Sequence, residues 1–190
     1  MRRGKSGEGH SESFTMAKVS QQLIEEALND FQGPLIGYAM GFLKDLDRSK
    51  DVVQDTFIKL SQQKTEKVER GLKTWLFTVC RNGALDQIRK NKRLVALDDD
   101  NRAELVSEDW SPDERADQED QHQVIWQLID RLSDNQQEVI RLKFQQDLSY
   151  REIAELTGLK EGNVGFLLHT GLKRLREMMP EELQPSHLKS

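Results

Sequence analysis

The chain has 190 residues, a length that fits one domain or two small ones. Its mean hydropathy is -0.73, and no apolar run approaches the ~18 residues that a membrane span needs. Its single cysteine, Cys80, excludes a disulfide framework within the chain and a metal site built from several thiolates. The net charge of -5 is unevenly spread. Residues 64–93 carry nine basic and three acidic side chains, which indicates contact with a polyanion. Residues 94–120 carry eleven acidic and two basic side chains, so this segment should repel a polyanion.

The first half of the chain has a helical pattern after a polar start. Residues 1–15 are rich in Gly, Ser and charge and lack the apolar segment of a secretory signal, so we expect a disordered tail on a cytoplasmic protein. Residues 16–93 then carry four apolar stripes at helical spacing, with breaks at Gly33-Pro34, at 44–49 and at 62–71. The stripes are Leu23, Ile24, Ala27 and Phe31; Leu35, Ile36, Ala39, Met40 and Leu43; Val52, Val53, Thr56, Phe57 and Leu60; and Leu72, Trp75, Leu76, Val79, Ala84 and Ile88.

The second half begins with a different composition. Residues 94–120 are acidic, contain Pro112 and have no sustained period, which predicts an extended, flexible linker. The run Asp98-Asp99-Asp100 within it is interpreted as solvated charge rather than as a metal site. Helical periodicity returns over residues 121–179, and the prolines of residues 180–190 predict a frayed tail. We therefore expect an all-α protein with two small helical domains, 16–93 and 121–179.

Residues 149–169 have the pattern of a helix-turn-helix. Ser149 and Glu152 form a capping box, Ala154 is the small residue where two helices approach, and Gly158 occupies the turn, where positive φ favours glycine. Residues 160–178 then form the second helix, which in this motif contacts base edges in the major groove. A plain pair of packed helices has the same core spacing and is the alternative interpretation.

Two further helical segments present polar faces. Residues 50–60, KDVVQDTFIKL, combine an acidic and amide face with an apolar one. Residues 72–93, LKTWLFTVCRNGALDQIRKNKR, place Asn and Asp between basic side chains, a combination that suits hydrogen bonds to bases and contacts with phosphates. Taken alone, each face is more typical of a solvated helix surface. Cys80 lies on the apolar stripe of the second segment, which favours a buried thiol over a redox sensor.

The order VQDTF, then TWLFTVCRNGALDQIRKNKR, then LSDNQQEVIRLKFQQDLSYREIAELTG resembles the extracytoplasmic-function group of sigma-70 family RNA polymerase sigma factors. The resemblance covers about residues 31–178 apart from the linker. It implies a non-enzymatic initiation factor, without cofactor or metal, that brings core polymerase to promoter DNA. It also implies contacts with the clamp of the largest polymerase subunit and with the polymerase flap, a linker directed toward the RNA exit path, and an anti-sigma protein as a further partner, as in many members.

The resemblance assigns roles to three sets of residues. Binding of the polymerase clamp is assigned to Asp51, Val53, Gln54, Asp55, Phe57 and Leu60. Contact with the −10 promoter element is assigned to Arg70, Lys73, Arg81, Asn82, Asp86, Arg89, Lys90 and Arg93, with loop 63–73 capturing a flipped base. Contact with the −35 element is assigned to Arg151, Lys160, Glu161, Asn163, Phe166, His169 and Lys173. The alternatives are a stand-alone helix-turn-helix regulator and, without support from any motif, an enzyme that uses the acidic cluster.

The second helix of the helix-turn-helix departs from the family pattern. Its stretch GNVGFLLHTGLKRLR has Gly165, Leu167, Thr170 and Leu172 where basic residues are common in the family. The helix is apolar nearly all round because of Phe166, Leu167, Leu168 and Leu172, and such a helix is often covered. We therefore expect either a partner protein or the N-terminal half of the chain to cover this helix in the free protein.

Overall fold

The computed structural model describes residues 18–68, 71–97 and 119–180. Within these ranges the regular structure is helical, apart from one isolated β-bridge between Lys18 and Lys64, which confirms the all-α prediction. Several predicted features lie outside the described residues: the N-terminal tail, the C-terminal tail apart from Pro180, most of the acidic linker with Asp98-Asp99-Asp100, and Arg70. The helices are α1 (Gln21–Leu43), α2 (Leu46–Ser61), α3 (Thr65–Val68), α4 (Leu72–Leu97), α5 (Glu119–Ile129), α6 (Asp134–Phe144), α7 (Tyr150–Thr157) and α8 (Glu161–Met178).

Helix α1 is continuous, so the break predicted at Gly33-Pro34 is wrong. Proline has no N–H to donate to the preceding turn, which normally kinks or ends a helix. Pro34 is exposed, whereas Leu35 and Ala39, which follow it, are completely buried. The burial of this apolar face offsets the one backbone hydrogen bond that proline cannot make.

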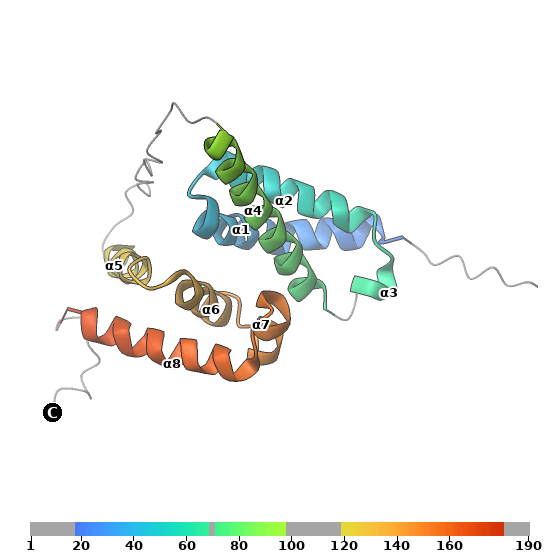
Figure 1. Cartoon of the computed structure of the whole chain (residues 1–190). Coiled ribbons are helices and arrows are strands. Elements are labelled where there is room, and N and C mark those ends of the chain that lie inside the picture. Colours follow the sequence, from blue (N-terminus) through green and yellow to red (C-terminus); the bar gives the residue numbers. More distant parts are fainter. Residues whose placement is uncertain (1–17, 69–70, 98–118, 181–190) are drawn as a thin grey trace, which may run out of the picture.

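The N-terminal bundle, α1 to α4, forms around three long helices. Figure 1 shows α1 and α2 side by side, with α4 crossing them. The core includes Leu60 and Leu76, as predicted, and also Phe77, which the predicted stripe on α4 omits. Phe77 is fully buried and its ring packs edge-on against the Tyr38 ring at 5.2 Å between centroids. Helix α4 contacts α1 and α2 on one side and α7 on another, so its buried face is wider than a single stripe.

The C-terminal bundle, α5 to α8, contains the predicted helix-turn-helix. The Ser149 hydroxyl accepts a hydrogen bond from the Glu152 N–H, and the Glu152 carboxylate accepts one from the Ser149 N–H, which confirms the capping box. Gly158 ends α7 at φ 77°, as expected for a turn that favours glycine. Val164, Leu168, Gly171 and Leu175 form the buried face of α8. At Gly171 an added Cβ would lie 2.9 Å from Ile140 Cδ1, so α8 packs closely on α6 here and a larger residue would require the Ile140 side chain to shift.

Replacing Gly158 with alanine is expected to destabilise the C-terminal bundle by about 1–2 kcal/mol, because an L-residue is strained at positive φ. The added Cβ would meet nothing within 4 Å, so the effect isolates backbone strain. Gly162→Ala is the matched control, since its Cβ also meets nothing but its φ is not positive. Urea unfolding measures both variants, and equal stabilities would contradict the assignment.

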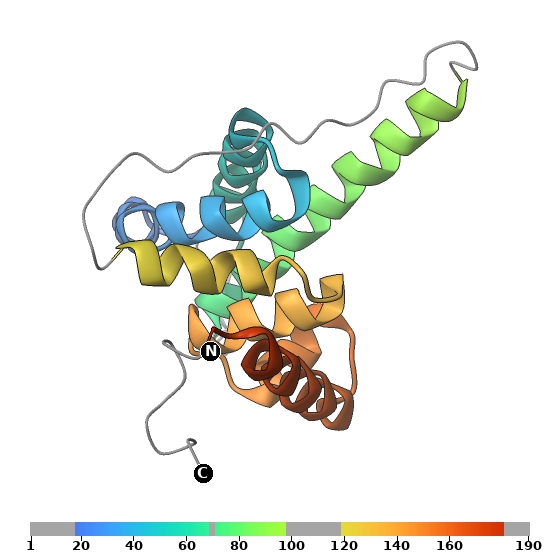
Figure 2. The same ribbon diagram turned by 90° about the vertical axis from the view of Figure 1, so that its left-hand side faces the viewer.

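The boundaries of the linker differ from the prediction of 94–120. Helix α4 continues to Leu97 and α5 begins at Glu119, so each helix extends into the predicted linker. The two bundles also pack against each other rather than lying apart on a tether. Figures 1 and 2 both show α5 to α8 against one side of the N-terminal bundle, with α4 and α7 in contact.

Candidate functional site

A groove of about 440 Å³ lies between α1 and α2, on the face predicted to bind a protein partner. Its lining residues are Leu28, Gln32 and Ile36 from α1, and Lys50, Val53, Gln54, Phe57, Ile58 and Ser61 from α2. Gln54, predicted from the sequence, is exposed there, and Asp51 and Asp55 are exposed on the same helix. Ile58 was not predicted, yet its side chain is large, apolar and 47% exposed. The sequence could have predicted that Ile58 shares the exposed face of Gln54, because residues four positions apart lie on the same face of a helix.

The apolar residues predicted to contact the partner have a different role. Leu60 is completely buried in the N-terminal bundle, so its assignment as a contact residue is wrong. Val53 and Phe57 are also buried, and only their surfaces that form the floor of the groove could contact a partner. An apolar stripe on an amphipathic helix faces the bundle core first, so the polar side chains beside it form the free surface.

The exposed face of α4 carries most of the residues predicted to contact the −10 element. Asn82, Asp86, Arg89, Lys90 and Arg93 are all exposed. The Asp86 carboxylate accepts a hydrogen bond from Arg89 Nη1 at 2.6 Å within one helical turn. Such an exposed ion pair is weak and easily exchanged for a new partner. This face therefore exposes an amide, a carboxylate and several cations along one helix, as expected from the spacing of these residues in the sequence.

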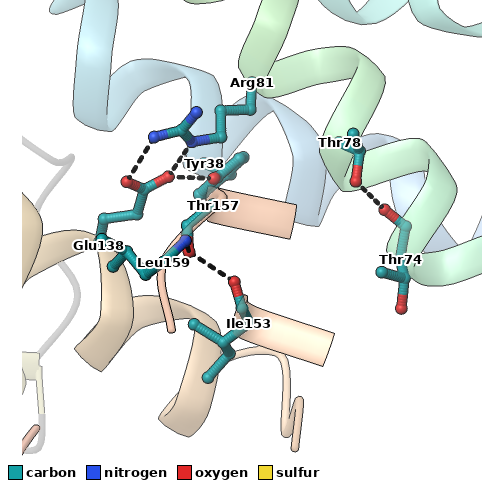
Figure 3. Close-up of polar contacts among 8 residues, drawn as sticks. All are labelled: Tyr38, Thr74, Thr78, Arg81, Glu138, Ile153, Thr157 and Leu159. Atoms are coloured by element: carbon teal, nitrogen blue, oxygen red, sulfur yellow. Dashed lines mark hydrogen bonds and ion pairs between the residues drawn. The ribbon is translucent and has the colours of Figure 1, made fainter. Parts of the chain in front are cut away.

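Arg81 and Lys73, two other residues predicted to contact the −10 element, face the C-terminal bundle instead. Arg81 donates from Nε to Glu138 Oε1 at 2.6 Å and from Nη2 to Glu138 Oε2 at 3.2 Å (Figure 3). The Tyr38 hydroxyl donates to the same Oε1 at 2.7 Å, and Lys73 Nζ donates to the Gln146 carbonyl. In this arrangement neither cation is free for a nucleic acid.

Burial and charge both act on this cluster. Burial raises the pKa of the Tyr38 hydroxyl well above its usual value, and the neighbouring Glu138 carboxylate raises it further. Burial opposes the charge on Arg81, but its hydrogen bond and attraction to Glu138 raise the pKa of its guanidinium overall. Tyr38 therefore stays a neutral donor and Arg81 a cation. Glu138 is separated in sequence from Arg81 by 57 residues and from Tyr38 by 100, so no local pattern could have predicted the cluster.

Figure 3 also shows how local bonds fix the helices around this cluster. The Thr78 hydroxyl donates to the Thr74 carbonyl at 2.7 Å within α4. The Thr157 hydroxyl donates to the Ile153 carbonyl at 2.6 Å and accepts from the Leu159 N–H at 3.3 Å. The first of these two bonds lies within the last turn of α7, and the second ties the turn between α7 and α8 to the end of α7.

The surface of α7 and α8 presents the residues predicted to contact the −35 element. All seven are exposed: Arg151, Lys160, Glu161, Asn163, Phe166, His169 and Lys173. Phe166 is 66% exposed, so the N-terminal bundle does not cover it, and that half of the masking hypothesis is wrong. The N-terminal bundle instead contacts the C-terminal bundle chiefly where α4 meets α7. Covering by a partner protein stays a prediction.

In residues 18–68, 71–97 and 119–180, no group of three or more His, Cys, Asp or Glu side chains is placed to hold a metal ion. No helix in the same ranges has the length and apolar character needed to cross a membrane.

Known proteins match both bundles. The model of sigma-70 region 2 matches residues 28–94, and that of sigma-70 region 4 matches residues 122–175. The chain is 30% identical to the ECF RNA polymerase sigma factor SigX of Bacillus subtilis over 89% of this chain and 91% of that one, and 25% identical to SigM of the same organism over 82% and 94%. A solved structure of the sigma factor RpoE in complex with the anti-sigma factor NepR from Bartonella quintana is similar with a TM-score of 0.63 and 29% identity, over 81% of this chain and 94% of that one.

Proposed function

The chain belongs to the ECF sigma factors of the sigma-70 family, and from this we propose that it binds core RNA polymerase through α2 and directs it to promoters through α4 and α8. The polymerase supplies the chemistry of RNA synthesis, and this protein supplies the choice of start site. Such a function places the protein in the cytoplasm with the polymerase.

One observation carries the proposal: the two matched regions each expose a polar helix face beside a well-formed core. In region 2 these are the α1–α2 groove with Gln54 and Ile58, and the α4 face with Asn82. In region 4 it is the start of α8, where Glu161 and Asn163 are exposed at the end that enters the major groove. The groove suits a helical protein partner, because an apolar floor with polar rims is how helices dock in grooves.

Transcription in vitro with core polymerase and a library of promoter fragments tests the proposal. We expect transcripts from defined start sites only when both the protein and core polymerase are present. The protein should also co-purify with core polymerase. Protection of a duplex site by the protein alone, without any binding to core polymerase, would instead support a stand-alone helix-turn-helix regulator.

Replacing Asn82 with alanine is expected to reduce formation of the open promoter complex by about tenfold or more, because one good base contact is worth about 1–3 kcal/mol. Binding to core polymerase should not change, since α4 presents Asn82 away from the α1–α2 groove, which it does not line. Permanganate footprinting of the melted strand measures the first quantity and a pull-down the second. An equal loss of both would assign Asn82 a structural role.

The apolar surface of α8 points to a regulatory partner. Phe166 and Leu172 are exposed on this helix, and the similar RpoE structure was solved with an anti-sigma factor. We propose that a protein of this class binds the chain and covers α8.

A further inference from the structure

The start of α8 exposes an amide and an aromatic side chain at the end of the helix that the proposed function places in the major groove. We propose that α8 selects promoters by A·T base pairs: Phe166 packs on the 5-methyl group of thymine, and Asn163 binds the edge of a neighbouring adenine. Guanine, by contrast, has no matching side chain on this part of the helix. This inference rests on the proposed function, since it assumes that α8 reads the −35 element.

The stretch of α8 between Lys160 and Lys173 has no basic residue. Guanine presents two acceptors in the major groove, and it is usually selected by a basic side chain that donates to both. Glu161, the acidic residue of this stretch, only accepts hydrogen bonds, and the two ring nitrogens of His169 point apart and cannot donate to both acceptors at once. The two lysines lie roughly 20 Å apart along the helix, more than the ~12 Å width of the major groove, so they suit the phosphates on its two rims.

Phe166 points away from the core of the C-terminal bundle. It lies two residues from Val164 and Leu168, which are buried, and two residues correspond to about half a helical turn. Its side chain is 66% exposed, and Figures 1 and 2 both show α8 on the side of its bundle that faces away from α1 and α2. The one apolar group among the base edges of the major groove is the methyl of thymine, so thymine is the base that an exposed phenyl ring matches.

Two positions beside Phe166 are already engaged within the C-terminal bundle. The Thr170 hydroxyl donates to the Phe166 carbonyl at 2.8 Å and accepts from Gln136 Nε2 at 3.1 Å. The Tyr150 ring lies beside Gly165, where an added Cβ would be 3.5 Å from Tyr150 Cε2. Thr170 is therefore held by α6, and Gly165 has no side chain to offer. Neither position supplies the cation that is common there in the family.

Asn163 is exposed three residues before Phe166, on the neighbouring part of the same surface. A side-chain amide matches adenine, because it can accept from the N6 amino group and donate to N7 at the same time. Three residues rise about 4.5 Å along the helix, which is close to the ~3.4 Å spacing of base pairs. The two side chains therefore suit neighbouring A·T pairs, one read at adenine and the other at thymine.

The first test begins with promoters selected by transcription in vitro, using core polymerase and a library randomised across the −35 region. We expect the selected elements to be defined by A·T pairs. Deoxyuridine then replaces each thymidine of a selected −35 element, which removes the 5-methyl group and leaves base pairing intact. The affinity of the complex of this protein with core polymerase should fall about fourfold for each contacted methyl, the factor that corresponds to the ~0.8 kcal/mol of one buried carbon group.

Variants of Phe166 assign the methyl contact to this side chain. Phe166→Ala should bind the thymidine promoter more weakly and should no longer distinguish it from the deoxyuridine promoter. Phe166→Leu keeps an apolar side chain and should keep part of the distinction. Phe144→Ala is the matched control, because Phe144 is 62% exposed but lies on α6, and this variant should keep the full fourfold factor. Circular dichroism verifies that each variant keeps its helix content.

The outcomes separate the inference from the proposed function. If the wild type directs transcription with core polymerase but its −35 elements are defined by guanines, or deoxyuridine has no effect, the thymine preference is refuted and the proposed function stands. If Phe166→Ala keeps the fourfold factor, another side chain contacts the methyl and the role of Phe166 is refuted. If the wild type neither binds core polymerase nor supports transcription, the proposed function fails and the inference fails with it.

Discussion

Phe77→Ala is expected to lower the free energy of unfolding by about 3–5 kcal/mol, the range measured when a buried phenylalanine is truncated. Phe77 is completely buried and packs against Tyr38, so its removal leaves a cavity where α4 crosses α1. A small helical domain has little stability in reserve, and a loss of this size unfolds much of its population. We expect the variant to lose polymerase binding and open-complex formation together, because both surfaces belong to the N-terminal bundle.

Ile58→Ala is the matched comparison. Ile58 is 47% exposed, so its truncation should change stability little, yet it removes the main exposed apolar group of the α1–α2 groove. Thermal unfolding and a polymerase pull-down on both variants distinguish the two effects. Phe77→Ala should lower both the unfolding temperature and the amount of polymerase recovered, whereas Ile58→Ala should lower only the amount of polymerase recovered. A stable Phe77→Ala protein would mean that the core of this bundle does not depend on the crossing of α1 and α4.

The features predicted correctly from the sequence are the ones that depend on near neighbours in the chain. The capping box joins Ser149 and Glu152 across three residues, and the positive φ at Gly158 is a property of one residue. Both can be deduced from residue types at fixed spacing. The exposed face of α4 follows in the same way, because residues such as Asn82 and Asp86 repeat with the period of one helix.

The features that were missed depend on tertiary packing. Pro34 has the local chemistry of a helix break, and only the burial of Leu35 and Ala39 against other helices overrides it. Phe77 falls off the single stripe of α4 because more than one side of that helix is covered. Glu138 is one more polar residue in the run DNQQE at the start of α6, and only the packing of two bundles distant in sequence gives it Arg81 as a partner.

The same distinction explains why the candidate site was predicted in part. Sequence spacing finds which residues share a helix face, but it does not show which of them another bundle covers. Arg81 and Asn82 are adjacent in sequence, yet one is paired with Glu138 and the other is exposed. A set of contact residues inferred from the family therefore includes side chains, such as Arg81, that the packing of the two bundles pairs with a residue of this chain.

The double change Gln54→Ala, Asp55→Ala is expected to weaken binding to core polymerase by about tenfold to a hundredfold. Both side chains are exposed on α2, and Gln54 lines the groove. Interface residues that matter contribute more than about 1 kcal/mol each when truncated, and ~1.4 kcal/mol is a factor of ten in affinity. Neither residue is buried, so the fold should be kept. Fluorescence anisotropy of the labelled protein against core polymerase gives the dissociation constant.

The control pair is Asp47→Ala, Gln62→Ala, which also removes one carboxylate and one amide from the two ends of α2. Neither residue lines the groove, and both are exposed. The two double variants have the same net charge, so long-range attraction to polymerase changes equally in both. A difference between them therefore measures contact at the groove. Equal affinities would show that charge alone guides this helix to polymerase, and the groove would then have no part in binding.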